Sequence, residues 1–326
     1  MGETERGEQD EFEAAHTGCG GGRAMTGPLY AGVELGGTKC VCTLARGPED
    51  IVEQRRISTT TPDETLGAIE HVLGGWMHAH RPAALGLASF GPLDLDPASA
   101  RYGYITATTK PGWRDADVAT RLAHRTGLPT GIDTDVAGAA LAEHRWGGAI
   151  GLSSFVYVTV GTGVGAGIVV GGQPVRGLGH PEAGHMHVAR MAGDRWPGAC
   201  TFHGDCVEGL ASGFAIKQRA GRAASQIASD DPVWTTAAHA IAGLCHNLVM
   251  TAAPERILIG GGVVTQQPQL LPMIRRMLVE SLAGYGDAAG IERQIDRFVV
   301  LPSLGDQAGP LGSLALAMAV GSRSAD

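Results

Sequence analysis

The most informative shortage in this sequence is that of long apolar runs. None reaches the roughly 20 residues that a helix needs to cross a bilayer. Apolar residues nevertheless make up 44% of the 326 residues, enough for a sizeable core. The first residues are acidic and contain no apolar segment, so we expect no secretory signal peptide. A membrane-spanning or exported protein is therefore not expected.

Positive charge is also scarce. The chain has 25 lysines and arginines against 33 acidic residues, a formal net charge of −8. Such a chain has no general attraction for nucleic acid or for an anionic membrane. Its cysteines are too few and too scattered for a dense disulfide framework, and a metal site in a reducing cytoplasm fits them better. They are Cys19, Cys40, Cys42, Cys200, Cys206 and Cys245.

Aromatic residues make up only 5% of the chain, whereas glycines number 50, which predicts many tight turns. The length suits one large domain or two of medium size. Residues 1–27 are polar and acidic and contain three consecutive glycines, so we expect them to be disordered. Met25 is an alternative start for the folded protein.

Cysteine and histidine gather in residues 180–208, HPEAGHMHVARMAGDRWPGACTFHGDCVE. Cys200, His203 and Cys206 follow a C-x2-H-x2-C spacing, and His185 can fold back from a preceding strand. Two thiolates and two imidazoles suit tetrahedral Zn²⁺, so we predict a structural zinc site with these four ligands. The alternative is a pair of buried free cysteines beside surface histidines. The rival ligands are His180, His187 and Asp205.

Two acids, Glu182 and Glu208, lie beside these ligands in the sequence. A metal-fixed loop that presents carboxylates can form a binding wall for a polar ligand. A second polar, turn-rich stretch, ITATTKPGW over residues 105–113, contains Lys110 and Trp113.

Two stretches share one pattern of strand, glycine turn and strand. They are LYAGVELGGTKCVCTLA at residues 29–45 and SSFVYVTVGTGVGAGIVVGGQPV at residues 153–175. The first turn contains Gly36 and Gly37, for which a hairpin predicts positive φ. Neither turn matches the usual phosphate-loop patterns, but such turns can direct backbone N–H groups at phosphate oxygens. The alternative for the first stretch is an ordinary hairpin. Their recurrence indicates two similar domains that face each other across a nucleotide.

Acids and glycines follow two further predicted strands. Ile132 is expected to end one strand, and Asp133, Thr134 and Asp135 then lie on a turn before a helix. Asp133 or Thr134 can cap that helix, or Asp135 can face a ligand at the strand end. The other strand, within residues 256–264, ends in GGG at residues 260–262, which either admits a flat group such as adenine or makes a tight turn.

The remaining pattern predicts alternating strands and helices. Strands are expected over 85–94 and 298–302. Helices are expected over 61–80, 115–125, 210–224, 235–253, 271–283 and 305–320, the last returning to the N-terminal domain.

Together these motifs resemble the ROK sugar kinases, most closely the bacterial fructokinase branch. The resemblance covers residues 29–321 in order. It is carried by VELGGTK, ASFGPLD, ITATTKPGW, IDTDVAGAALAE, VTVGTGVGAG, GHPEAGHMHV, the C-x2-H-x2-C cluster followed by EGLASG, and LIGGGV. It implies an α/β, two-lobed actin/hexokinase-like (ribonuclease H-like) ATPase fold with a zinc-binding loop. The implied lobes are residues 28–130 with helix 305–321, and residues 131–304.

The resemblance also implies roles for single residues. Asp135 aligns with the catalytic base, and Glu34, which replaces a usual Asp, is expected to help orient hydrated Mg²⁺. The implied sugar-binding residues are Glu182, His185, Glu208 and Lys110. The implied ATP-binding residues are Gly36, Gly37, Thr38, Lys39, Thr162, Gly163, Gly260, Gly261 and Gly262. Thr134 and Ala137 depart from the family's two Asn positions.

The function that the resemblance implies is ATP- and Mg²⁺-dependent phosphorylation of a hexose, most closely fructose, by a cytoplasmic homodimer. Relatives that phosphorylate glucose, mannose or N-acetylmannosamine are the alternatives within the family. A sugar-sensing repressor of the same fold is the alternative from another class. It requires a DNA-binding segment ahead of VELGGTK, where this sequence has about 28 acidic, glycine-rich residues.

Overall fold

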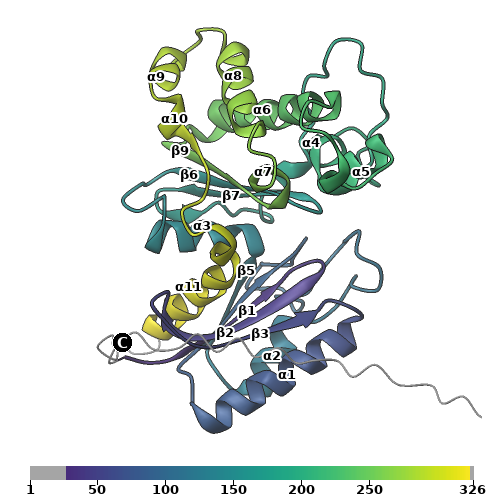
Figure 1. The fold of residues 1–326 in the computed structure, drawn as a ribbon. Coiled ribbons are helices and arrows are strands. Elements are labelled where there is room, and N and C mark those ends of the chain that lie inside the picture. Colours follow the sequence, from purple (N-terminus) through teal and green to yellow (C-terminus); the bar gives the residue numbers. More distant parts are fainter. Residues whose placement is uncertain (1–26, 324–326) are drawn as a thin grey trace, which may run out of the picture.

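The computed structural model describes residues 27–323. Almost all of the predicted disordered segment, residues 1–27, thus lies outside the described residues. Two five-stranded sheets lie one above the other, with two helices between them and further helices on both outer sides (Figure 1). This is the α/β architecture expected from the sequence. None of the helices between residues 27 and 323 combines the length and the apolar character needed to cross a membrane.

The first sheet has the strand order β3-β2-β1-β4-β5. Its strands are β1 (Tyr30–Leu35), β2 (Lys39–Gly47), β3 (Asp50–Ser58), β4 (Leu85–Ser89) and β5 (Thr130–Thr134). The hairpin β1–β2 is antiparallel, whereas β4 runs parallel to both β1 and β5.

The second sheet repeats this topology. Its order is β10-β9-β6-β7-β8, with strands β6 (Phe155–Val160), β7 (Val164–Val170), β8 (Gln173–Pro174), β9 (Arg256–Gly260) and β10 (Val299–Val300). The antiparallel hairpin β6–β7 corresponds to β1–β2, and β9 runs parallel to β6 as β4 does to β1. The recurring strand–glycine–strand pattern thus forms the same hairpin at the same position in both sheets.

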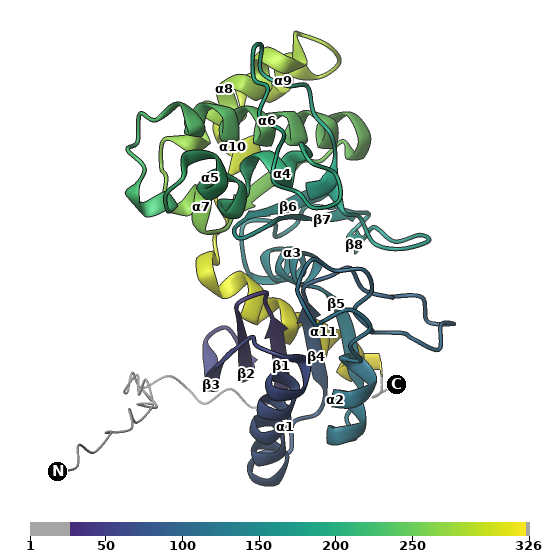
Figure 2. The same ribbon diagram turned by 90° about the vertical axis from the view of Figure 1, so that its right-hand side faces the viewer.

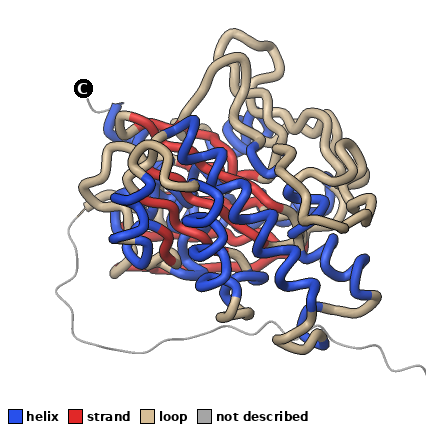
Figure 3. The backbone as a smooth tube through the Cα atoms, turned by 90° about the horizontal axis from the view of Figure 1, so that it is seen from above, coloured by secondary structure: helices blue, strands red, loops and turns tan. Residues whose placement is uncertain are grey.

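The helices complete a layered arrangement. Two lie outside the first sheet, α1 (Pro62–Ala79) and α2 (Ala119–Thr126), and two lie between the sheets, α3 (Asp135–Trp146) and α11 (Ala308–Arg323). Those beyond the second sheet are α4 (Val207–Ala211), α5 (Gly213–Ala220), α6 (Pro232–Ala252), α7 (Gly262–Thr265), α8 (Leu270–Leu282), α9 (Ala288–Arg293) and α10 (Ile295–Phe298). Seen from above, helices lie across the strands (Figure 3).

The helix expected over residues 115–125 begins only at Ala119. Asp115 has a φ of 64°, in the left-handed region, and Asp117 forms an isolated bridge with Tyr104. Both features exclude helical backbone before residue 118. Asp117 Oδ1 then accepts the Thr120 N–H at 3.0 Å in the first turn of α2.

Other element boundaries also differ from expectation. β3 was not expected, because its exposed residues carry no clear alternation. The helix over 210–224 is replaced by α4 and α5, which break at Ser212, whose Oγ accepts the Ala215 N–H at 3.1 Å. The strand expected within 256–264 stops at Gly260, and that over 298–302 covers only Val299–Val300.

The last helix lies against the first sheet because glycines remove the side chains between them. α11 packs on β1, β4 and α3. A Cβ on Gly86 of β4 would lie 1.9 Å from the Ser313 carbonyl oxygen, and one on Gly312 would lie 2.4 Å from Gly138 of α3. No larger residue fits at either contact without a backbone shift. β5, which runs to Thr134, belongs to this sheet, beyond the proposed lobe boundary at residues 130 and 131.

One buried carboxylate holds both connections between the two halves. Glu143 of α3 is fully buried. It accepts N–H groups from Gly148, in the connection to β6, at 2.5 Å, and from Ser303 and Leu304, in the connection to α11, at 3.2 and 2.8 Å. A carboxylate with several backbone donors is well satisfied inside a protein.

We expect Glu143→Ala to lower the free energy of unfolding by about 3 kcal/mol, because three part-buried hydrogen bonds to a fully buried carboxylate are lost. Urea unfolding followed by circular dichroism measures the change. Glu280→Ala removes an exposed carboxylate on α8 and serves as the control, with an expected change below about 0.5 kcal/mol. Equal effects of the two variants would contradict a special role for Glu143.

Candidate active site

A cleft of about 800 Å³ lies between loops of the two halves. Its walls come from the loop after β4, the loop at residues 107–110, the start of α3, the β6–β7 turn and the segment 180–208. The predicted residues that line it are Gly37, Lys110, Asp135, Thr162, Gly163, Glu182, His185, His203 and Glu208. The sequence motifs are thus brought together from distant parts of the chain.

Asp135 is the first residue of α3 and faces this cleft. Its Oδ1 accepts the Val136 N–H at 2.9 Å, which fixes the carboxylate. Burial raises the pKa of Asp135 to about 6. A carboxyl group with such a pKa is mostly ionised at neutral pH and can accept a proton.

The neighbours of Asp135 take the structural roles that the sequence left open. The strand runs through residue 134, beyond Ile132, where it was expected to end. Thr134 is the helix cap, since its Oγ1 accepts the Ala137 N–H at 3.2 Å. Asp133 is 2% exposed and pairs with Arg176. Asp135 therefore neither caps the helix nor pairs with Arg176, and its carboxylate is free to face a ligand.

Several carboxylates share the cleft region. Burial, followed by the charges of Asp135 and Glu208, raises the pKa of Glu182 to about 7. Burial and then the charge of Asp135 raise the pKa of Glu34 to about 7. The Glu34 carboxylate lies against the first turn of α11, where a Cβ on Gly309 would fall 1.9 Å from Oε1. The region therefore favours ligands that bring positive charge or hydrogen-bond donors.

The ligand atoms of His185, Cys200, His203 and Cys206 lie within 4.8 Å of one another. The two Nδ1 atoms are 3.3 Å apart. The Sγ atoms of Cys200 and Cys206 lie 3.5 and 3.6 Å from His185 Nδ1. A tetrahedral ion at zinc distances requires about 3.3 Å between nitrogens and about 3.6 Å between nitrogen and sulfur. The donor set fits such an ion. His185 lies on a 3₁₀ turn, Ala183–His185, and not on the strand expected.

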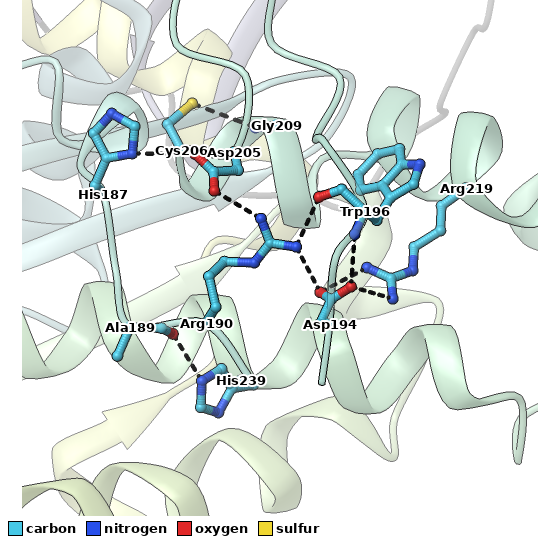
Figure 4. A network of polar contacts seen from close by, with 10 residues as sticks. All are labelled: His187, Ala189, Arg190, Asp194, Trp196, Asp205, Cys206, Gly209, Arg219 and His239. Carbon is cyan, nitrogen blue, oxygen red and sulfur yellow. Dashed lines mark hydrogen bonds and ion pairs between the residues drawn. The ribbon is translucent and has the colours of Figure 1, made fainter. Parts of the chain in front are cut away.

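The rival ligands bind other partners. His180 Nε2 accepts the Leu93 N–H at 2.9 Å. His187 Nδ1 lies 3.4 Å from Asp205, whose other oxygen accepts from Arg190 at 2.7 Å. Figure 4 shows how Arg190 and Arg219 converge on Asp194, and their guanidinium groups, that of Arg219 first, hold the pKa of this carboxyl well below its usual range. This network supports the loop that carries Cys200, His203 and Cys206.

Glu208 joins the metal cluster to the second glycine turn. Its Oε2 accepts the Val164 N–H at 3.0 Å, and its Oε1 lies 3.9 Å from His185 Nε2. A Cβ on Gly163 would lie 2.6 Å from Oε2, so glycine is required for this approach. Because Nδ1 of His185 faces the other metal donors, its Nε2 remains directed at the cleft side.

The first glycine turn is shaped by close contacts. Neither Gly36 nor Gly37 lies in the left-handed region, so the expected positive φ is wrong. Instead, a Cβ on Gly36 would lie 2.7 Å from the Lys39 carbonyl oxygen, which accepts the Gly36 N–H at 3.1 Å. Lys110 Nζ donates to the Gly37 carbonyl at 2.5 Å and thereby ties the loop at residues 107–110 to this turn. Thr38 and Lys39 are exposed and do not line the cleft.

The glycines at residues 260–262 also stand outside the lining of the cleft. Gly261 has a φ of 88°, and its Cβ would lie 2.5 Å from Val160 backbone atoms. A Cβ on Gly260 would lie 2.9 Å from Pro302, whereas Gly262 meets no atom closer than 3.7 Å. A tight turn accounts for Gly260 and Gly261, and their contact with adenine stays a prediction.

Sequence reasoning missed several lining residues, notably Phe90, Thr108, Thr109, Thr159 and Phe202. They lie in loops or at a strand end, inside the stretches that carry the family resemblance, but their residue types alone indicate no role. The polar, turn-rich stretch around Thr108 and Thr109 was a further hint.

Comparison with known families decides the identity. The model of the ROK family matches residues 30–320. The chain belongs to the ROK family. The family predicted from the motifs is thereby confirmed.

ROK relatives match over nearly the whole chain. A fructokinase from Zymomonas mobilis is 44% identical over 89% of this chain and 97% of its own length. A fructokinase from Pediococcus pentosaceus is 39% identical over 89% and 98%. The structure of a ROK glucokinase from Streptomyces griseus, solved with glucose and AMPPNP, superposes with a TM-score of 0.71 at 26% identity, covering 89% and 99%. The actin-like, two-sheet fold expected from the sequence is therefore confirmed.

Proposed function

We propose that this protein is an ATP-dependent fructokinase that transfers the γ-phosphoryl group of ATP to the 6-hydroxyl of D-fructose. The observation that carries the proposal is the convergence of Asp135, Glu182 and Glu208 in one cleft beside the two glycine turns. Fructokinases at 39% and 44% identity over most of the chain support both the reaction and the sugar. The neighbour solved with glucose and AMPPNP supports a hexose and an ATP-type nucleotide as the ligands of this fold.

Asp135 is the general base of this proposal. Its carboxylate accepts the proton of the sugar hydroxyl as the new O–P bond forms and the bond between the γ-phosphorus and the bridging oxygen of ADP breaks. Phosphoryl transfer has a loose transition state, so most of the catalysis is positioning and charge stabilisation. The Val136 N–H keeps the carboxylate in place, and Thr134 caps the helix that carries it.

The sugar is held by Glu182, Glu208, His185 and Lys110, which all line the cleft. Two carboxylates and an imidazole N–H offer both acceptors and a donor to sugar hydroxyls. Lys110 also donates to the Gly37 carbonyl, so a sugar bound at its loop is linked to the first glycine turn.

ATP is held by backbone N–H groups of the two glycine turns in this proposal. The residues concerned are Gly36, Gly37, Thr38, Lys39, Thr162 and Gly163, with Gly260, Gly261 and Gly262 toward the adenosine. Mg²⁺ is required with ATP, as in kinases generally, and the half-buried Glu34 carboxylate would help to orient its hydration shell. Closure of the cleft would bring the two turns to the same polyphosphate.

The metal held by His185, Cys200, His203 and Cys206 is proposed to be zinc. Four protein ligands leave no open position for a substrate, so this ion would have a structural role. It would fix the loop on which Glu208 and His185 meet the sugar. The division into lobes at residues 28–130 with 305–321 and at 131–304, the homodimer and the cytoplasmic location stay proposals from the family resemblance.

We expect Asp135→Asn to lower kcat by about 10²–10⁴-fold, because the amide cannot accept the hydroxyl proton. The KM for fructose should change far less, since the side chain keeps its size. Steady-state kinetics of ADP release measures both values. Asp230→Asn, at an exposed position outside the cleft, is the matched control. A kcat of Asp135→Asn within tenfold of wild type would sink the assignment.

The pKa of Asp135, raised to about 6, predicts the acid limb of the pH profile. Only the ionised carboxylate is a base, so kcat/KM should fall below about pH 7, where Glu182 takes up its proton, and more steeply below about 6, where Asp135 is protonated as well. An ordinary aspartate would place this limb near pH 4. ADP quantified by chromatography avoids coupling enzymes, and a return to full activity at pH 7.5 excludes unfolding. An unchanged rate at pH 5 would contradict the prediction.

The function itself is tested by an ADP-release assay with fructose, mannose, glucose and N-acetylmannosamine, with and without a zinc chelator. We expect the highest kcat/KM with fructose and its loss on chelation, because the wall of Glu208 and His185 loses its support. Turnover of another hexose alone would retain the mechanism and correct the substrate. Metal-replete, folded protein that turns over none of the four would contradict the kinase proposal.

A further inference from the structure

The segment that leads from β8 to Glu182 belongs to the second half of the chain, but two contacts hold it to the first half. The first contact is the ion pair between Arg176 and Asp133 of β5. The second is a hydrogen bond in which His180 Nε2 accepts the N–H of Leu93, in the loop after β4, at 2.9 Å. Figure 2 shows this segment beside β8, on the side of the molecule where the loops above β4 and β5 also lie. Glu182 follows two residues after His180.

The bond from Leu93 determines which nitrogen of His180 carries a proton. A nitrogen that accepts an N–H cannot itself be protonated, so Nε2 is bare and the neutral ring carries its hydrogen on Nδ1. Burial lowers the pKa of His180, so the ring is neutral at neutral pH. Its side chain is only 6% exposed, which keeps water from competing for either nitrogen.

The hydrogen on Nδ1 has one carboxylate in reach. Nδ1 lies 3.4 Å from Oε1 of Glu182 and 3.5 Å from the carbonyl of Pro181. Gly91 packs against both side chains, since a Cβ there would lie 3.3 Å from His180 Cε1 and 3.4 Å from Glu182 Oε1. Of these two contacts, the one with the Pro181 carbonyl has hydrogen-bond geometry, and Oε1 of Glu182 lies beside the same nitrogen and against the loop after β4.

We propose that His180 is a positioning residue of the kinase, which orients the Glu182 carboxylate toward the sugar through its Nδ1–H group. Through its Nε2 it fixes that carboxylate to the loop after β4, so that Glu182 moves with the half that carries Asp135. The proposal rests on the proposed function, in which Glu182 binds a sugar hydroxyl.

Two substitutions separate the two nitrogens. His180→Gln places an acceptor near the position of Nε2 and keeps the bond from Leu93, but offers Glu182 no donor at Nδ1. His180→Asn places an amide donor near the position of Nδ1 and keeps the contact with Glu182, but leaves the Leu93 N–H without its acceptor. We expect His180→Gln to raise the KM for fructose about tenfold, with kcat within about threefold of wild type.

His180→Asn should have a KM closer to wild type and a lower thermal stability than His180→Gln. A residue with only a structural role would give the opposite order of KM, so that His180→Gln would be the milder variant in KM as well as in thermal stability. That order would overturn the proposal. His71→Gln, at an exposed position of α1, is the control and should match wild type in both.

A double-mutant cycle with Glu182→Gln tests whether the effect passes through Glu182. If His180 acts on the sugar by orienting this carboxylate, His180→Gln should add little to the KM of Glu182→Gln. A full, multiplicative increase in the double variant would overturn the proposal. The cycle is run with whichever hexose the wild-type protein turns over fastest, so a wrong substrate assignment does not affect it.

The tautomer is measured independently of turnover. Proton–nitrogen correlation spectra of histidine-labelled wild-type protein, with the His180 signal identified by its loss in His180→Gln, report which ring nitrogen carries the hydrogen. Hydrogen on Nδ1 supports the proposal, and hydrogen on Nε2 overturns it. A wild-type protein without kinase activity would contradict the proposed function, while this spectrum would still decide the orientation of His180.

Discussion

The arrangement of the cleft depends on keeping several carboxylates in one poorly hydrated space. Burial raises the pKa of Glu34, Asp135 and Glu182, and the charge of Asp135 raises the pKa of Glu34 and Glu182 further, so each ionised group needs a fixed partner. Asp135 accepts the Val136 N–H, Glu208 accepts the Val164 N–H, and Glu182 faces the ring of His180. These neighbouring groups belong to a helix start, a glycine turn and a loop that contacts both halves. The backbone thus holds these carboxylates at defined positions. Their remaining oxygen lone pairs are free to accept hydrogen bonds from ligands.

A duplicated topology creates the space in which these groups meet. Both sheets place an antiparallel hairpin beside a parallel strand in the same order, and both hairpins end in glycine turns. Parallel strands of an open sheet offer their carboxyl ends to ligands, and β5 presents Asp135 from such an end. The second half adds what the first lacks, a loop held by four metal-type donors whose spacing fits a tetrahedral ion. The wall beside the metal-type donors and the two glycine turns therefore come from different structural features.

Much of this could be read from the sequence, and the reason differs between features. The metal donors were predictable because three of them lie within seven residues, so their proximity is local. Asp135 was predictable from its place after a strand and from the family motif. The partner of Lys110, 73 residues earlier in the chain, and the partner of His180, 87 residues earlier, have no local pattern. β3 was missed because an exposed edge strand shows no clear alternation of apolar and polar residues. The late start of α2 was missed because the sequence does not show that Asp115 has a left-handed backbone conformation.

The hydrogen bonds that Glu143 makes to both connections would act as a pivot for any rotation of one half relative to the other. If one half turned relative to the other, the displacement of each atom would grow with its distance from Glu143. Asp135 lies on the same helix only eight residues away, about 12 Å along its axis, so its lever arm is short. In such a motion the end of the cleft at Asp135 would keep its geometry, whereas the rim loops would travel farthest. A protein built this way could admit a large ligand while the Asp135 carboxylate keeps its position.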